Sequence, residues 1–487
     1  MLSPRSILLQ LLLCILSTTL VAQDVFYIDS TSGQDLASVT GNASSPFETL
    51  TYAVSRSSAG NSVLVHCLPG VYEKEVWPLQ VTTDAMTVQA VSPGSVLFTS
   101  STSVFANFRL VPSSGDLTLR GLSVQGGRQF VRLVGSGALG DQIHIILENM
   151  DIHAETALQV TVGGDAYVNA DVRMCEIQAI DTGFAFFAHE RTHVKANIQR
   201  CTIRNGTKNG VEAIASDASS ELEINIENTV IRDFANHAIL VESAGGASNL
   251  MLNSCNLVRN GIVSSPRKEA VSLVRPNASS SYPHAVLMRN ILSDNGGDLR
   301  DFGSMPWNFT FESNLVQDQS LSGLGGNIVG DAAFVGSAMV LGARSDAWGA
   351  APVGGLAEDY YGNIRDADGR GDIGAFEHKA FTFGVDGRAP LGDLLRMGVS
   401  GQPNQPFLLY AGWSTNPGQG LQVNPMPIAN PGVSSTLDAA GAWSFDYHMP
   451  NTPAMAGRRS YFQVEGLLLN GMTAYSQVIP VLPVYDL

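Results

Sequence analysis

A dense run of ionisable side chains lies near the middle of the chain, at residues 189–195, with the sequence His-Glu-Arg-Thr-His-Val-Lys. An arginine or a lysine can remove a proton in a general-base step, and a nearby carboxylate can hold a cation. We therefore consider Arg191 or Lys195 as a base, with Glu190 or Asp181 as the cation ligand. Turns between strands also collect charges, and a solvated turn with Lys195 pointing outward is the favoured interpretation of this run.

A second candidate site is a stretch of extra residues at 276–284, with the sequence Pro-Asn-Ala-Ser-Ser-Ser-Tyr-Pro-His. An insertion in a repeating fold bulges outward, and such loops often bind ligands. Tyr282 and Trp307 are able to stack on sugar rings, and His284 lies at the end of the same stretch. The alternative is a loop without a ligand, because lengthening a surface loop costs little free energy.

A third candidate is the segment 366–377, which nearly matches a calcium-binding loop. Asp366 and Asp368 occupy positions one and three, a glycine occupies position six, and Glu377 occupies position twelve. Position five is Arg370, a cation where an oxygen ligand is needed, and the flanks do not have a helical pattern. We therefore favour a structural cap over a calcium-binding loop, which stays the alternative, and we expect no other cofactor. The cysteines form no Cys-X-X-Cys pair, so zinc is not expected either.

A repeat must position these candidates. Segments ending in Asn or Cys recur at spacings of 26, 26, 27, 27, 35 and 24 residues, and the recurring residues are Asn149, Cys175, Cys201, Asn228, Cys255, Asn290 and Asn314. Apolar columns share the period: Val168, Val194, Leu222 and Leu250; Val172, Ile198, Ile226 and Leu252; and Leu158, Phe184, Val211 and Ile239. Apolar and polar residues alternate between them, as in strands with one buried face. The pattern predicts a right-handed parallel β-helix with three short strands per coil.

The recurring Asn and Cys residues are predicted to form a structural ladder inside this helix. Coils stack about 4.8 Å apart, so asparagine side chains in one column can hydrogen-bond along the stack. Cysteine is small and readily buried, and it fits the same slot. Cys175 and Cys201 fall on adjacent coils, so their spacing is compatible with a disulfide but does not require one.

The beginning of the chain contains two further features. Residues 1–22 have one positive charge, Arg5, then an apolar stretch and a small-residue end, which is typical of a signal peptide. Ser45-Pro46-Phe47-Glu48 has the pattern of a helix start, and it predicts a helix that ends at Gly60 and covers the exposed end of the β-helix.

Composition limits the partners. Only 15% of the residues are charged, glycine is abundant with 49 residues, and the formal net charge is −16. Such an acidic surface repels phosphate backbones, so nucleic acid is not an expected partner. It also disfavours polyanionic ligands unless a local basic patch overrides the overall field. No second apolar run is long enough to span a bilayer once the signal peptide is removed.

Two stretches resemble known families. Tyr27-Ile28-Asp29, Ser45-Pro46-Phe47 and Pro69-Gly70-Val71-Tyr72 resemble the opening of secreted bacterial β-helix proteins related to the pectate-lyase-like superfamily. Asp372-Ile373-Gly374-Ala375-Phe376-Glu377 resembles the closing motif of choice-of-anchor Q proteins. The resemblance implies that a β-helix ends there, with Ile373 and Phe376 packed on the last coil. It also implies an extracellular glycan as the substrate class of any enzymatic activity, through a polysaccharide lyase reaction.

We therefore predict three parts: a signal peptide at 1–22, a β-helix at 23–380, and a β-rich module with a small β-sandwich at 381–487. The expected function is that of a secreted or cell-surface protein, without catalysis, which presents its β-helix for adhesion or for contact with a polysaccharide or an envelope component. The alternatives are a polysaccharide lyase and a passive envelope component. The oligomeric state is not predicted.

Overall fold

The computed structural model describes residues 23–487 with gaps at 59–60, 84, 102, 114, 264–267, 277–282, 304–307, 336–338, 343, 353–354, 363–364, 366–370, 378–381, 387–393, 402–403, 416–422, 426–432, 440, 449–459, 468–472, 477–478 and 482–487. The predicted signal peptide and four of the candidate site residues, Tyr282, Trp307, Asp366 and Asp368, lie outside the described residues.

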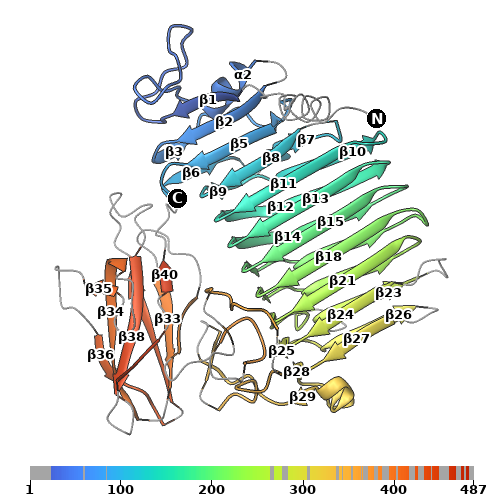
Figure 1. Ribbon diagram of the computed structural model, residues 1–487, viewed down its shortest axis with the longest axis vertical. Helices are drawn as coiled ribbons and strands as arrows, with labels where there is room; N and C mark the ends of the chain where they lie inside the picture. The colour runs from blue at the N-terminus through green and yellow to red at the C-terminus, as the bar shows by residue number, and fades with distance from the viewer. Residues whose placement is uncertain are drawn as a thin grey trace, which may run out of the picture.

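Two large parallel sheets form the walls of a β-helix (Figure 1). The eleven-stranded sheet, which we call the front sheet, faces the viewer in Figure 1. Its strands are β1 (Gln23–Ile28), β2 (Ser62–Cys67), β5 (Ala85–Ala90), β8 (Asp116–Arg120), β11 (Gln142–Glu148), β13 (Tyr167–Arg173), β15 (His193–Gln199), β18 (Glu221–Glu227), β21 (Ala247–Asn253), β24 (His284–Met288) and β27 (Asn308–Glu312).

The eighteen-stranded sheet, which we call the back sheet, contributes the other two strands of most coils. In β12 and β14 these two strands are continuous. The strands are β3 (Gly70–Tyr72), β4 (Leu79–Gln80), β6 (Val96–Thr99), β7 (Ala106–Leu110), β9 (Ser123–Gln125), β10 (Gln129–Gly137), β12 (Asp151–Gly164), β14 (Glu176–Ala188), β16 (Thr202–Arg204), β17 (Val211–Ala215), β19 (Val230–Arg232), β20 (Ile239–Ser243), β22 (Asn256–Val258), β23 (Val271–Arg275), β25 (Ile291–Ser293), β26 (Leu299–Gly303), β28 (Leu315–Val316) and β29 (Ile328–Val329).

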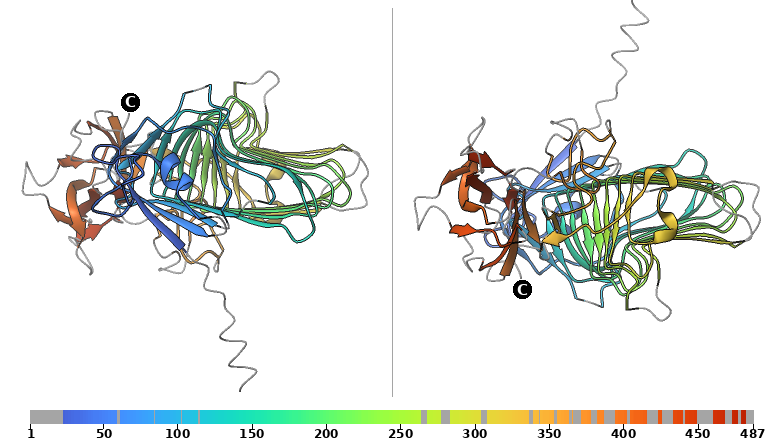
Figure 2. Two further views of the ribbon diagram at one scale, coloured as in Figure 1. Left: turned by 90° about the horizontal axis from the view of Figure 1, so that it is seen from above. Right: turned by 90° about the horizontal axis from the view of Figure 1, so that it is seen from below.

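These registers confirm the predicted parallel β-helix. Viewed along the stack, the coils are elongated, and they enclose one continuous core (Figure 2). Two predicted apolar columns are in register, the one that begins at Val172 and the one that begins at Leu158. The third was wrong at its last member, because Leu222 pairs with Ser248 and not with Leu250. Alternation along the strands sends apolar side chains into the core and polar ones outward.

The turn after each front strand confirms five of the seven predicted ladder residues and corrects the other two, Asn149 and Asn228, by one position. Asn149 and Asn228 have φ angles of 53° and 47°, and they belong to a column of left-handed residues that also contains Met174, Arg200, Ser254, Arg289 and Ser313. Asparagine tolerates this conformation better than most residues do. The buried slot is the next position, which holds Met150, Cys175, Cys201, Thr229, Cys255, Asn290, Asn314 and Asn327.

Within this slot the last three residues form an amide ladder. Asn290 Nδ2 donates to Asn314 Oδ1, and Asn314 Nδ2 donates to Asn327 Oδ1, both at 3.0 Å. The cysteines replace the amide: Cys201 Sγ donates to the carbonyl of Gln199 at 3.2 Å, and Cys255 Sγ donates to that of Asn253 at 3.3 Å. All four cysteines of the described chain are free thiols.

The helix near the N-terminus begins later than predicted. It is α2 (Leu50–Ser55), its N-cap is Thr49, and the Thr49 side chain accepts a hydrogen bond from the backbone N–H of Tyr52. Pro46 and Phe47 precede it in an extended segment, because the Phe47 N–H bonds to the carbonyl of Tyr27 beside β1. The helix packs against β1 and β2.

The described residues of the segment 357–377, which we call the lateral strap, lie against the side of several coils and not only on the last ones. Phe376 packs with Val230 and Val258, and Ile373 packs with Ile291 and Leu315. The buried Arg365 guanidinium donates to Asn228 Oδ1 at 2.9 Å and to the Gly374 carbonyl at 2.7 Å. The closing motif therefore covers the outward apolar side chains of the three-residue strands.

Two antiparallel sheets follow. One contains β32 (Thr382–Asp386), β33 (Leu394–Ser400) and β37 (Ala442–His448). The other contains β34 (Pro406–Thr415), β35 (Val423–Pro425), β36 (Val433–Thr436), β38 (Ser460–Leu467), β39 (Thr473–Tyr475) and β40 (Ile479–Val481). Both contribute to one hydrophobic core. A short hairpin, β30 (Phe334–Val335) with β31 (Val340–Leu341), precedes them, and short 3-10 turns occur at Gln319–Leu321 and Leu324–Gly326. The described residues include no helix that is long and apolar enough to cross a membrane.

Candidate functional site

The structure separates the four residues predicted as catalytic. Lys195 lies on β15 of the front sheet, whereas Asp181 lies on β14 of the back sheet and holds Lys208 at 2.7 Å. Arg191 and Glu190 lie in the turn between β14 and β15: Arg191 forms an ion pair with Asp165, and Glu190 accepts a hydrogen bond from Gly164 N at 2.8 Å. Each of the four side chains therefore bonds to a group on a neighbouring coil, and the four do not converge on one point.

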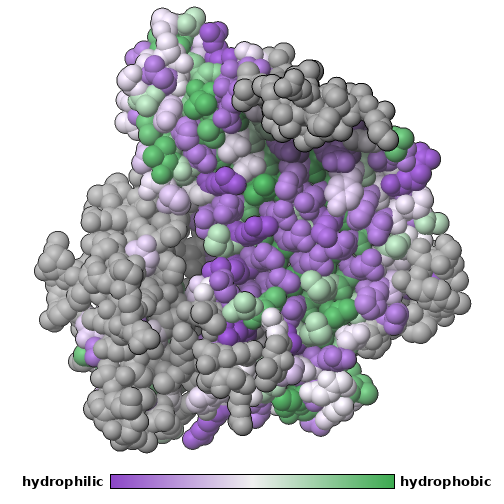
Figure 3. Space-filling view, viewed as in Figure 1, coloured by the Kyte–Doolittle hydropathy of each residue, from purple (hydrophilic) through white to green (hydrophobic). Residues whose placement is uncertain are grey.

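A different set of polar side chains gathers on the outer surface of the front sheet. The outward positions of β11, β13, β15 and β18 form columns across four successive coils. Figure 3 shows a broad hydrophilic area over these strands. We call this surface the polar face, and its members are His144, Tyr167, Asn169, Asp171, His193, Lys195, Asn197, Glu221, Glu223 and Asn225.

At the centre of the polar face, Asp171 connects three strands. Its Oδ2 lies 2.8 Å from His144 Nε2, and its Oδ1 accepts a hydrogen bond from Asn197 Nδ2 at 2.7 Å. Because a carboxylate only accepts, this contact assigns the Nε2–H tautomer to His144, whose Nε2 also lies 3.1 Å from the Asn169 side-chain amide. Partial burial opposes ionisation of Asp171, but these hydrogen bonds outweigh it and lower the pKa of the carboxyl group. Asp171 is therefore an anion that is held in place by its neighbours.

Lys195 is the cation of the polar face. Its Nζ donates to Glu223 Oε1 at 2.7 Å, and Asn225 Nδ2 donates to the same oxygen at 2.9 Å. The hydrogen bond to Glu223 raises the pKa of Lys195 above its usual value. Partial burial would raise the pKa of Glu223, but the bonds from Lys195 and Asn225 lower it. A lysine with a raised pKa stays protonated near neutral pH, so this pairing disfavours Lys195 as a general base.

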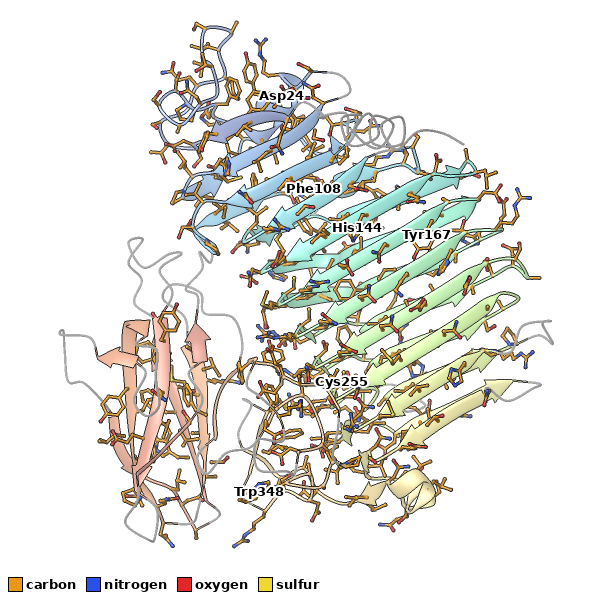
Figure 4. The ribbon with its side chains drawn as sticks, in the orientation of Figure 1. Asp24, Phe108, His144, Tyr167, Cys255 and Trp348 are labelled. Atoms are coloured by element: carbon orange, nitrogen blue, oxygen red, sulfur yellow. The ribbon has the colours of Figure 1, made fainter. Side chains whose placement is uncertain are left out.

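Aromatic side chains form one margin of the polar face. Tyr167, the first residue of β13, is 37% exposed, and its ring contacts that of His193 edge to face, with the centroids 4.7 Å apart. His193 Nδ1 lies 3.6 Å from Glu221 Oε2 on the next strand. Figure 4 labels Tyr167 and His144, which stand on the neighbouring strands β13 and β11 of the front sheet. An exposed aromatic ring beside planar hydrogen-bonding groups suits contact with a sugar ring.

The other predicted sites have different outcomes. His284 begins β24, in the column that contains Asn249, so it extends the front sheet, while its predicted partners Tyr282 and Trp307 lie outside the described residues. Glu377 is buried, and its carboxylate accepts the Asp372 N–H at 3.1 Å and faces Arg365 at 3.5 Å. In the part of the chain that is described, no group of three or more His, Cys, Asp or Glu side chains is arranged to hold a metal ion.

The sequence contained a signal for the polar face. Asn169, Lys195 and Glu223 recur in one column, and Asp171, Asn197 and Asn225 recur two residues later in the next. Each set occupies the outward positions of strands whose inward positions are apolar. The dense charged run at 189–195 drew attention to a turn, whereas the polar face is built from side chains that lie 26 to 28 residues apart.

The chain was also compared with known proteins. No protein-family model and no curated protein matches the chain. Among solved structures, it is similar to the pectate lyase Pel9A, with 16% identity and a TM-score of 0.39 over 74% of this chain and 97% of that one. It is similar to a rhamnogalacturonan lyase, with 12% identity and a TM-score of 0.36 over 60% and 87%.

A third solved structure is the enzymatically active domain of the bacteriophage CBA120 tailspike protein 2, with 10% identity and a TM-score of 0.30 over 88% of this chain and 69% of that one. At these identities and scores, neither an activity nor the role of any residue carries over to this chain.

Proposed function

We propose that this chain is a secreted or cell-surface protein that binds an extracellular glycan on its polar face, without catalysing a reaction. The observation that carries the proposal is the lattice of amide, carboxylate and imidazole groups across four coils, with Tyr167 at its margin. Its rows are about 4.8 Å apart, so one saccharide chain that lies across the strands meets a fresh row of donors and acceptors at each coil. The acidic surface as a whole favours a neutral glycan over a polyanionic one.

The absence of catalysis in this proposal is supported by the separation of the candidate acid–base groups. Lys195 forms an ion pair with Glu223, Arg191 with Asp165, and Asp181 with Lys208. A lyase needs one base positioned at one substrate proton, and each of these side chains instead bridges two coils. The predicted leader at 1–22 supports secretion.

A glycan array with the full chain tests the proposal, followed by titration of the best ligand and by an assay for unsaturated sugar ends. We expect binding without unsaturated products. The Tyr167→Ala variant should bind roughly tenfold more weakly, because an aromatic contact contributes about 1 kcal/mol or more, while Tyr167→Phe should keep most of the affinity.

Three outcomes would contradict the proposal. Unsaturated products that disappear in the Lys195→Ala variant would identify a lyase. Equal affinity of the wild type and of Tyr167→Ala for every bound glycan would place the binding surface elsewhere. A chain that binds no glycan on the array would favour a passive envelope component.

A further inference from the structure

Two arginines lie side by side on the back sheet, on a different wall of the β-helix from the polar face. Arg109 on β7 pairs in register with Arg132 on β10, so their side chains leave the sheet on the same side, about 4.8 Å apart. Phe108, labelled in Figure 4, is buried in the core, so strand alternation points the next residue, Arg109, outward. Arg109 is exposed and Arg132 is half-buried.

These two arginines lack the carboxylate partners that other arginines of the β-helix have. Arg120 lies 2.9 Å from Glu148, Arg128 lies 3.2 Å from Glu155, and Arg300 lies 3.0 Å from Glu269. Within the described ranges of the chain, neither Arg109 nor Arg132 forms an ion pair, although acidic residues outnumber basic ones by 44 to 28. The protein therefore leaves two adjacent positive charges uncompensated at one place.

The environment of Arg132 orients its guanidinium. The group lies over the ring of Phe105, 4.5 Å from the centroid, while Arg128 lies 5.5 Å from the same centroid and gives its charge to Glu155. The Nε atom of Arg132 is buried, and it has no hydrogen-bond partner among the described residues. Burial, and then the neighbouring charge of Arg109, lower the pKa of Arg132. A bound anion would offset both effects, because an opposite charge favours the charged form of the guanidinium.

Amide side chains extend the same column on both sides. Gln80 on β4 pairs in register with Arg109, and Gln159 on β12 pairs with Arg132. Phe105, which is 46% exposed, lies at the edge of the pair. The column therefore offers two charged donors between two neutral amides, with an apolar ring beside them, which is a suitable lining for a sugar that carries one anionic group.

We propose that Arg109 and Arg132 bind a tetrahedral oxyanion ester, a sulfate or a phosphate group carried on a saccharide. Each guanidinium presents a rigid fork of donors, and an anion with three terminal oxygens gives the two forks more separate acceptor atoms than the two oxygens of a carboxylate do. A sulfate or phosphate ester has three terminal oxygens, enough to bridge both arginines. This site lies on the back sheet, so it stands or falls separately from glycan binding on the polar face.

Calorimetric titration of the full chain at low ionic strength tests the site, with galactose 6-sulfate, galactose 6-phosphate and unmodified galactose as ligands. At least one ester should bind, with an affinity that falls as salt is added, and galactose should not bind at this site. Which ester binds more tightly identifies the group. The double variant Arg109→Gln/Arg132→Gln should bind roughly a hundredfold more weakly or worse, because it removes two charged hydrogen-bond donors.

The Arg300→Gln variant is the control, because Arg300 lies on β26 of the same sheet and its substitution also removes positive charge, one unit instead of two, but the partner of Arg300 is Glu269. It should bind as the wild type does. The Arg109→Lys/Arg132→Lys variant keeps the charge but loses the forks, and we expect an intermediate affinity. Failure of both esters to bind, or equal affinities of the wild type and the double glutamine variant, would overturn the proposal.

Discussion

Replacing Asn314 by alanine should destabilise the C-terminal coils strongly. The Asn314 side chain is fully buried, and it takes part in four hydrogen bonds: its Oδ1 accepts from the N–H and from the Nδ2 of Asn290, and its Nδ2 donates to Asn327 Oδ1 and to the carbonyl of Leu287. At about 1 kcal/mol net for each bond, the loss is about 4 kcal/mol, and the groups left unpaired in the core add to it.

The matched control is Asn149→Gly. Asn149 lies in the column of left-handed residues, with a φ angle of 53°, and the coil before it has a glycine, Gly121, with a φ angle of 68° in the corresponding turn. Glycine adopts this conformation without steric cost, so the free energy of unfolding should change by less than about 0.5 kcal/mol. The pair of variants therefore separates the buried slot from the turn position that precedes it.

Native-state hydrogen exchange measures the effect locally, which matters because a stack of coils does not unfold as a single unit. In Asn314→Ala, the backbone amides of Asn290 and Leu315 should exchange roughly a thousandfold faster, the equivalent of about 4 kcal/mol. Amides of β11 and β13, several coils away, should change little. Unchanged exchange at Leu315, or an equal loss of protection in Asn149→Gly, would refute the assignment of the buried slot.

Three further predictions follow from the described contacts. Partial burial opposes the ionisation of Asp171, but hydrogen bonds lower the pKa of its carboxyl group. The ionised carboxylate therefore stabilises the folded state at pH values above the usual carboxyl pKa, and this contribution is lost as the pH falls through the lowered pKa. Asp171→Asn should weaken the fall of the melting temperature in this acidic range, and an unchanged fall would contradict the prediction. Burial raises the pKa of the Cys255 thiol to about 12, so mass spectrometry should find it unalkylated until the protein unfolds, whereas labelling of the native protein would contradict its burial. Arg365→Met should destabilise the lateral strap by about 3–5 kcal/mol and speed proteolysis within it. The control Arg396→Met, at an exposed arginine, should not change the rate of proteolysis. Equal proteolysis rates of the two variants would show that the buried guanidinium of Arg365 does not hold the strap.

The fold could be predicted from the periodicity of the sequence because each coil buries apolar side chains at the same positions. Val172 and Ile198 repeat an inward position, and the structure pairs them directly. The error of one residue at Asn149 and Asn228 has a physical cause. Asparagine suits both the left-handed turn position and the buried slot that follows it, so the residue type alone does not separate the two. The φ angles of the backbone do.

The lateral strap shows what periodicity does not reveal. Its motif predicted packing by Ile373 and Phe376, but not that the partners are outward side chains of coils more than 50 residues earlier in the chain. Asn228, predicted as a ladder residue, instead donates to the Glu358 carbonyl and accepts from Arg365. Contacts across the outside of a solenoid connect segments that share no period, and they depend on the path of the chain.

The candidate site was harder to predict than the fold because its parts are dispersed. Local charge density pointed to Arg191 and Glu190, which stabilise a turn. The polar face draws one to three side chains from each coil, and only the register of the strands brings His144, Asp171 and Asn197 together. Aligning the outward positions of successive repeats, as well as the inward ones, would have identified this surface.

Hydroxyl-radical footprinting of the full chain, with and without the neutral glycan that binds best on the array, tests glycan binding by the polar face most directly. Side-chain oxidation reports solvent access at individual residues. Bound glycan should protect Tyr167 and His193, while Trp348, which is 46% exposed and lies outside the front sheet, should be oxidised equally in both states. Unchanged oxidation of Tyr167 and His193, with protection at another surface, would contradict the proposed binding face.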